Sequence, residues 1–241
     1  MESSISFLYT FNIEVMNMRI NFIRHSTTRA NEEGRISGAR VDLPLSPKGI
    51  KIIEDLKAQG IYPEDPGVIY ASALKRAAET IQIIYPGREV HRDAGLNERD
   101  FGDLETMSKE DADRYVREHF ITDDSEQEED LNNAPPNGES TRQVADRSKK
   151  VFRRLVKEFR EKGYETVTIC GHGAYLRDFA FAYGLPVLGE IKSDRYLDNG
   201  KGFTLEVDDS EDPKIKVVGY IGGETARDVL IDYVNRYKEK E

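Results

Sequence analysis

Met18-Arg19-Ile20-Asn21-Phe22-Ile23-Arg24-His25-Ser26 begins with a short, mostly apolar run, 18–23, which is followed by two basic residues, Arg24 and His25. Its length and composition predict a buried β-strand, and a second such run at 166–170 ends in Gly171-His172-Gly173. The chain has only four histidines. Two of them therefore follow predicted strands, at the carboxyl ends where open α/β sheets bind ligands. This coincidence predicts an active site that contains His25 and His172.

Outward from these runs, strands and helices alternate along the chain. Pro47 directly after Ser46 predicts the start of a helix, and the apolar positions within 140–162 recur at helical spacing. The alternation predicts an α/β fold with three layers (α/β/α): an open, mostly parallel sheet with helices on both faces. The expected strands are 18–23, 68–71, 166–170, 203–207 and 215–221, and the expected helices are 46–59, 74–85, 108–119, 140–162, 175–183 and 225–238.

We expect residues 18–241 to form a single domain with an N-terminal extension at 1–17. Apolar residues alternate with mostly polar ones in this extension, and two interpretations stay open. It is either an added strand, whose edge would pair with another subunit to give a homodimer, or a leader upstream of Met16 or Met18. Within the stretch 106–139, the run 123–130 is almost wholly acidic. We expect this stretch to be an acidic insertion, and a lid if it overhangs the site.

Composition excludes several classes of partner. The net charge of -10 and the pI near 5.1 argue against binding to nucleic acid or to an anionic membrane. No stretch approaches the roughly 20 apolar residues of a membrane-spanning helix. The lone Cys170 excludes an internal disulfide and any cysteine-rich metal site, which favours a reducing compartment and hence a cytoplasmic location. Any anion must be bound by a few local arginines.

The residues that follow the predicted strands favour phosphoryl chemistry. Arg24 follows the first strand and Arg76 follows the second, and each guanidinium can donate paired hydrogen bonds to phosphate oxygens. Histidine has a reference pKa of about 6.5, so a neutral ring nitrogen of His25 can attack phosphorus and form a phosphohistidine.

An ordered set of motifs resembles the histidine phosphatase superfamily, the phosphoglycerate mutase-like proteins, over roughly 18–207. A single Arg-His pair would be weak evidence, whereas this set follows the order of the family. The matching segments are Arg24-His25-Ser26-Thr27-Thr28-Arg29-Ala30-Asn31, Gly34-Arg35-Ile36-Ser37-Gly38, Asp42-Leu43-Pro44-Leu45-Ser46-Pro47-Lys48-Gly49, Ser72-Ala73-Leu74-Lys75-Arg76-Ala77-Ala78-Glu79-Thr80, Leu96-Asn97-Glu98-Arg99-Asp100-Phe101-Gly102, Pro135-Pro136-Asn137-Gly138-Glu139-Ser140 and Cys170-Gly171-His172-Gly173-Ala174-Tyr175-Leu176-Arg177.

The resemblance implies a role for each matching position. His25 would carry the phosphoryl group between Arg24 and Arg76, and His172 would hold an equatorial oxygen in the transition state. Glu98 would protonate the departing oxygen and then deprotonate the attacking water. Phosphoryl transfer of this kind rests on positioning and charge, so we expect neither a metal nor a cofactor.

The remaining candidates are expected to bind substrate. Asn31 and the backbone around Gly173 would complete the phosphate pocket, and Arg35 is a candidate for recognising the rest of the substrate. Ser26 stands where the family most often has glycine, and its hydroxyl could donate to a phosphate oxygen. Arg99 and Arg177 are weaker candidates, whereas His91 and His119 lack companions and are expected to be structural.

The pattern favours a phosphomonoesterase that acts on a small phosphate ester. The resemblance implies that mutases carry a long basic insertion after the Leu-Asn-Glu-Arg loop, whereas the corresponding stretch here is modest and acidic. A phosphoglycerate mutase that depends on a bisphosphorylated primer is the alternative enzyme. A phosphate-binding regulatory protein is the alternative of another class, although Glu98 would not be needed for binding alone.

Overall fold

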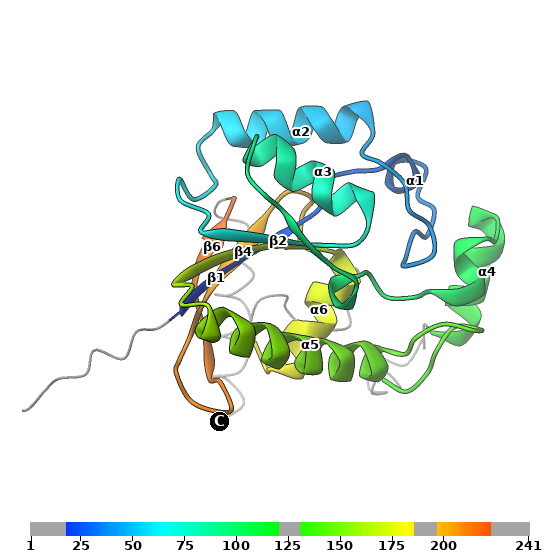
Figure 1. Ribbon diagram of the computed structural model, residues 1–241. Coiled ribbons are helices and arrows are strands. Elements are labelled where there is room, and N and C mark those ends of the chain that lie inside the picture. Colours follow the sequence, from blue (N-terminus) through cyan, green and yellow to red (C-terminus); the bar gives the residue numbers. More distant parts are fainter. Residues whose placement is uncertain (1–17, 121–130, 186–196, 223–241) are drawn as a thin grey trace, which may run out of the picture.

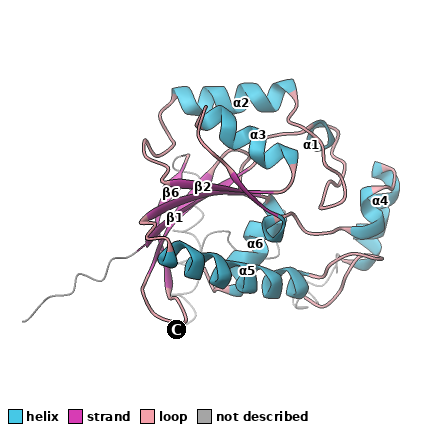
Figure 2. Cartoon of the chain, viewed as in Figure 1, coloured by secondary structure: helices cyan, strands magenta, loops and turns pink. Residues whose placement is uncertain are grey.

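The computed structural model describes residues 18–120, 131–185 and 197–222. Strands in this part of the chain form a six-stranded sheet with the order β3-β2-β4-β1-β5-β6. Figure 2 shows the strands in magenta between the helices. β1, β2, β3 and β4 are parallel, whereas β5 is antiparallel to both β1 and β6. The sheet is therefore mostly parallel, as predicted. The strand bounds are β1 (Met18–Arg24), β2 (Val68–Ser72), β3 (His91–Asp93), β4 (Thr166–Gly171), β5 (Gly202–Val207) and β6 (Ile215–Ile221).

Helices cover both faces of the sheet, which confirms the three-layer α/β/α fold (Figure 1). α2 (Pro47–Ala58) and α3 (Lys75–Ile84) lie on one face, and α5 (Thr141–Glu161) and α6 (Gly173–Ala182) lie on the other. The shorter elements are α1 (Arg29–Glu32), α4 (Lys109–His119) and the 3-10 turns η1 (Ala94–Leu96) and η2 (Gly102–Glu105). None of the described helices is both long enough and apolar enough to cross a bilayer.

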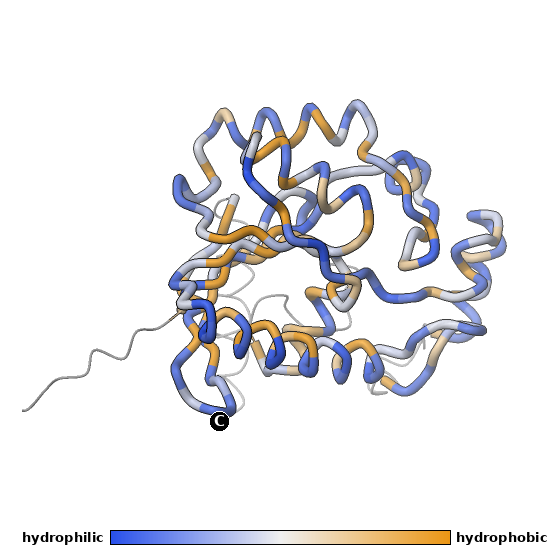
Figure 3. Tube along the Cα trace, viewed as in Figure 1, coloured by the Kyte–Doolittle hydropathy of each residue, from blue (hydrophilic) through white to orange (hydrophobic). Residues whose placement is uncertain are grey.

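Two apolar clusters, one on each face, hold the layers together. Because side chains alternate along a strand, Ile20 and Phe22 of β1 pack with α5 and α6, whereas Ile23 packs with α2 and α3. In Figure 3 the apolar positions of α5 form a band on the side of that helix that faces the sheet. Each large side chain buried in this way stabilises the fold by about 1.5–3 kcal/mol. This explains why the central strands are apolar on both faces.

Side-chain caps start the two long covering helices. The hydroxyl of Ser46 accepts a hydrogen bond of 3.0 Å from the amide of Gly49, and Pro47 occupies the first helical position of α2. Ser140 and Gln143 form a reciprocal capping box at the start of α5. These caps satisfy amides at the amino ends of both helices, and the amide of Ser46 also donates to Thr27 O, just beyond β1.

Some elements differ from the expectation. β3 was not predicted, because His91–Asp93 is a polar edge strand too short to show a period of two. The helix expected at 175–183 begins at Gly173, directly after His172, which is its N-cap residue. The extension 1–17, the acidic run 123–130 and the predicted helix 225–238 lie outside the described residues.

Candidate active site

The sheet order brings the two predicted histidines together. β1 lies next to β4, and Arg24 at the end of β1 is in register with Gly171 at the end of β4. His25 and His172 follow directly, and their ring centroids are 5.0 Å apart. Both residues are buried, with 3% and 0% of their surface exposed. Residues separated by most of the chain thus lie side by side at the carboxyl ends of two central strands.

The tautomer of His25 follows from its hydrogen bond. Its Nδ1 lies 2.5 Å from the carbonyl oxygen of Ser26. Because a carbonyl oxygen only accepts, Nδ1 carries the proton and donates it, so Nε2 of the neutral ring keeps its lone pair. The backbone of His25 is fixed as well: its amide donates to Gly171 O, and Asn199 Nδ2 donates to its carbonyl oxygen.

His172 has the opposite tautomer. Arg76 Nε donates to its Nδ1 over 3.3 Å. A guanidinium cannot accept, so the proton of the neutral ring lies on Nε2, which donates to the hydroxyl oxygen of Ser72 at 2.6 Å. Ser72 also accepts from the amide of Leu74, so this serine joins the end of β2 to His172. The sequence analysis quoted Ser72 in a motif without giving it a role.

Burial and positive charge keep both imidazoles neutral. Burial, and then the nearby Arg76 and Arg24, lower the pKa of His25 well below 6.5. Burial is also the main cause of the lowered pKa of His172, followed by Arg76. Both rings therefore carry a single proton at neutral pH, which leaves the lone pair on Nε2 of His25 that a nucleophile requires.

Arg76 is held by carbonyl oxygens of the segment 38–41. Its Nη1 donates to Val41 O and its Nη2 donates to Gly38 O, each over 2.9 Å. This segment is fixed in turn by Glu105, whose Oε2 accepts from the amides of Gly38, Arg40 and Val41. Burial raises the pKa of the Glu105 carboxyl and lowers that of the Arg76 guanidinium. Glu105 was missed from the sequence because only the fold places it beside this loop.

Arg24 packs against the start of α6. Its Nη1 donates to Leu197 O. A Cβ added at Gly173 would lie 3.0 Å from Arg24 Nε and 3.1 Å from its Cζ. Glycine at this position therefore lets the guanidinium approach the backbone next to His172.

Glu98 lies at the amino end of α6. Its Oε1 accepts from the amides of Tyr175 and Arg99 over 2.8 and 2.9 Å, and its Oε2 accepts from the amide of Ala174 over 3.2 Å. Because α6 begins directly after His172, these bonds hold the carboxylate against the helical turn that follows His172. The N-terminal end of a helix favours negative charge, which suits a carboxylate there.

Three of the expected substrate-binding side chains have other partners. The hydroxyl of Ser26 donates to Gly49 O over 2.8 Å, and it is the Ser26 carbonyl that contacts His25. Asn31 is exposed and its Oδ1 accepts from Thr28 in the capping box of α1. Arg35 is exposed and forms an ion pair of 2.7 Å with Glu33.

The weaker candidates also have structural partners. Arg99 donates to Glu139 O and Thr141 Oγ1, and Arg177 forms an ion pair of 2.8 Å with the buried Asp178. The ring of His91 packs 4.9 Å from that of Tyr70, and the exposed His119 stacks on Tyr115 at 4.0 Å. Within the described ranges, no three histidine, cysteine or acidic side chains gather in a way that could hold a metal ion.

Comparison with known proteins agrees with this geometry. The model of the histidine phosphatase superfamily (branch 1) matches residues 20–208. A phosphoglycerate mutase from Schizosaccharomyces pombe is 34% identical over 172 residues, covering 64% of this chain and 74% of the mutase. The alpha-ribazole phosphatase from Shigella flexneri has a TM-score of 0.63 and 25% identity, over 86% of this chain and 100% of its own. A mycobacterial glucosyl-3-phosphoglycerate phosphatase has a TM-score of 0.65 over 86% of this chain and 100% of its own, and at 24% identity it supports the fold alone.

Proposed function

The chain belongs to the histidine phosphatase superfamily, and from this premise we propose that it is a metal-independent phosphomonoesterase that acts on a small phosphorylated metabolite through a phosphohistidine at His25. The observation that carries the proposal is the state of His25. Its ring is buried, its centroid lies 5.0 Å from that of His172, and its Nδ1 bonds the Ser26 carbonyl oxygen, which leaves Nε2 with its lone pair. Burial, and then Arg76 and Arg24, lower its pKa. This is the arrangement a nitrogen nucleophile needs beside an anionic substrate.

The reaction has two steps. In the first, the lone pair of His25 Nε2 attacks phosphorus, the P–N bond forms and the bond to the ester oxygen breaks, while the carboxyl of Glu98 gives its proton to the departing alcohol. In the second, the Glu98 carboxylate takes a proton from water as the water oxygen bonds to phosphorus. The P–N bond breaks with its electron pair returning to Nε2, which releases phosphate and restores neutral His25. Arg24 and Arg76 stabilise the phosphoryl oxygens in both steps, and His172, which accepts from Arg76 Nε and donates to Ser72, orients the Arg76 guanidinium.

Two observations support hydrolysis over mutase activity. The run 123–130 is acidic, whereas the family resemblance associates mutases with a long basic insertion. The alpha-ribazole phosphatase from Shigella flexneri, at 25% identity, also aligns with 86% of this chain. Mutase activity is the second candidate, and the 34% identity to that protein favours it.

The deciding experiment measures hydrolysis of p-nitrophenyl phosphate by the wild type, by His25→Ala and by His119→Ala. We expect His25→Ala to lose about a thousandfold or more of kcat/KM, because it lacks the nucleophile. The exposed His119, which stacks on Tyr115 at the end of α4, is the matched control and should retain full activity. Acid-labile, alkali-stable phosphate should be trapped on the wild type and absent from His25→Ala.

The same preparation separates the alternatives. If 3-phosphoglycerate is isomerised faster than it is hydrolysed, and only with a bisphosphorylated primer, then the chain is a mutase. If phosphate binds but no ester is cleaved, then the chain is a phosphate-binding regulatory protein. Unchanged hydrolysis in His25→Ala would rule out the phosphohistidine.

A further inference from the structure

The loop that carries Glu98 is bound by a single arginine of α5. Arg147 Nη1 donates to Gly95 O over 2.9 Å and to Asn97 O over 3.1 Å, and its Nη2 donates to Glu98 O over 3.4 Å. One planar group therefore satisfies three carbonyl oxygens of a four-residue stretch of backbone. A lysine ammonium is a compact charge that cannot present this fork of donors.

Glu139 holds the same guanidinium and the far side of the same loop. Its Oε1 pairs with Arg147 Nε and its Oε2 with Arg147 Nη2, both over 2.9 Å. Its Oε2 also accepts from the amide of Asp100, and its own amide donates to Asp100 O over 2.7 Å. The Arg147–Glu139 ion pair therefore fixes the backbone on both sides of Glu98.

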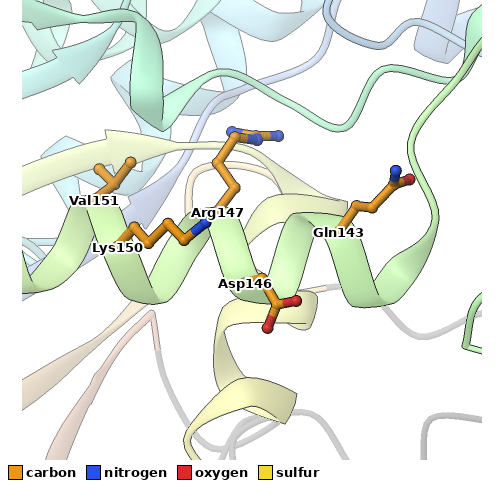
Figure 4. A pocket seen from close by; sticks show the side chains of 5 residues that line it. All are labelled: Gln143, Asp146, Arg147, Lys150 and Val151. Atoms are coloured by element: carbon orange, nitrogen blue, oxygen red, sulfur yellow. The ribbon is translucent and has the colours of Figure 1, made fainter.

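Arg147 also contacts a residue that binds the Glu98 carboxylate. Its guanidinium carbon lies 5.4 Å from the ring centroid of Tyr175, and the amide of Tyr175 donates to Glu98 Oε1. In Figure 4 the side chain of Arg147 extends from α5 on the side opposite to Asp146. With Val151 and other α5 residues it lines a surface hollow of about 480 Å³. Arg147 therefore reaches both the backbone of Glu98 and a partner of its carboxylate. Its positive charge is also the smallest of the causes, led by burial, that lower the pKa of His172.

We propose that Arg147, locked by Glu139, is a positioning residue that holds the Glu98 carboxyl where it can protonate the leaving oxygen. This inference rests on the proposed function, in which Glu98 is the proton donor. An alkyl phosphate needs that proton because an alkoxide is a strong base. Nitrophenolate is a weak base and departs without it, so a displaced Glu98 should slow the two substrates unequally.

The first test compares kcat/KM for glycerol phosphate and for p-nitrophenyl phosphate in Arg147→Lys, Glu139→Gln and Glu98→Gln. We expect Arg147→Lys to lose about tenfold to a hundredfold with glycerol phosphate and less than about threefold with p-nitrophenyl phosphate. Glu98→Gln should show the same selectivity, and Glu139→Gln a weaker version of it. The lysine keeps the positive charge near His172, so the loss would come from geometry.

Arg153→Lys is the matched control. Arg153 lies on the same helix and pairs with the exposed Asp212 over 2.8 Å. It should change neither rate. Equal losses with both substrates, or no loss in Arg147→Lys, would overturn the inference.

A second readout does not depend on turnover. The amides of Ala174 and Tyr175 bond the Glu98 carboxylate, so their hydrogen exchange should become faster in Arg147→Lys and stay unchanged in Arg153→Lys. Unchanged exchange in Arg147→Lys overturns the positioning role whatever the activity. A wild type that hydrolyses neither ester would instead contradict the proposed function, and amide exchange would still decide whether Arg147 holds Glu98.

Discussion

Nδ1 of His25 and Nδ1 of His172 have partners of opposite kinds, a carbonyl oxygen and a guanidinium nitrogen. The two neighbouring rings are therefore neutral in different tautomers. In the proposed reaction, His25 needs no deprotonation before it attacks, and the positive charge around it comes from Arg24 and Arg76. These two guanidiniums would attract a phosphate dianion while the ring of His25 stays neutral.

We predict that both imidazoles stay neutral in the folded protein down to well below pH 6.5. Nitrogen-15 NMR between pH 8 and 5.5 should show the proton of His25 on Nδ1 and that of His172 on Nε2. Because their folded pKa values lie below the unfolded value of about 6.5, the stability that this provides is complete above that pH. This stability is lost as the pH falls below 6.5, because the histidines of the unfolded chain bind protons there and the buried histidines of the folded chain do not. A titration midpoint at or above pH 6.5 for His25 would contradict this prediction.

At the scale of elements, the loop after β1 is bound by both helices of one layer. Ser26 donates from its hydroxyl to Gly49 O in α2 and from its amide to Thr80 Oγ1 in α3. The amide of Ser46, which caps α2, donates to Thr27 O. The position of His25 therefore depends on how closely α2 can approach this loop.

Gly49→Ala should test that approach. Alanine ordinarily stabilises a helix relative to glycine by about 0.5–1 kcal/mol. Here, a Cβ at position 49 would lie 2.0 Å from Thr27 O and 2.9 Å from Thr27 C, and backbone atoms cannot rotate away. We expect a net loss of about 1–3 kcal/mol in urea unfolding and reduced hydrolysis of p-nitrophenyl phosphate. Lys48→Ala, at the exposed neighbouring position, should change stability by less than about 0.5 kcal/mol. A stabilised Gly49→Ala would contradict the close contact.

At the scale of the whole molecule, the sequence predicts what depends on strand order and periodicity. The apolar runs at 18–23 and 166–170 become neighbouring parallel strands, so His25 and His172 meet. Chain order alone does not predict where the outward side chains of a loop will point. The side chains of Ser26 and Arg35, which the sequence analysis expects to bind substrate, contact Gly49 and Glu33 in the fold.

Residues that support the site through other residues are equally hard to predict. Glu105 and Arg147 act on backbone atoms of loops distant from them in the sequence, and no local pattern marks such a contact. Asp178 is a further example, because in the sequence it is only an acidic residue next to Arg177 in a mostly apolar segment. The fold buries that carboxylate completely, and its Oδ2 has no hydrogen-bond partner among the described residues.

Asp178 gives the whole molecule a pH dependence opposite to that of the two histidines. Burial raises the pKa of its carboxyl to about 6, although Arg177 and Arg99 oppose this change. Between pH 4 and 6 the folded state therefore binds more protons than the unfolded state, so this group's contribution to stability falls as the pH rises through that range. Asp178→Asn keeps the shape and removes the titration. Relative to the wild type, the variant should become more stable by about 1 kcal/mol between pH 5 and 7.5 in urea unfolding. Subtracting one curve of stability against pH from the other removes the contribution of the two histidines, because both proteins contain them. A difference that does not change with pH would show that the Asp178 carboxyl does not titrate in this range.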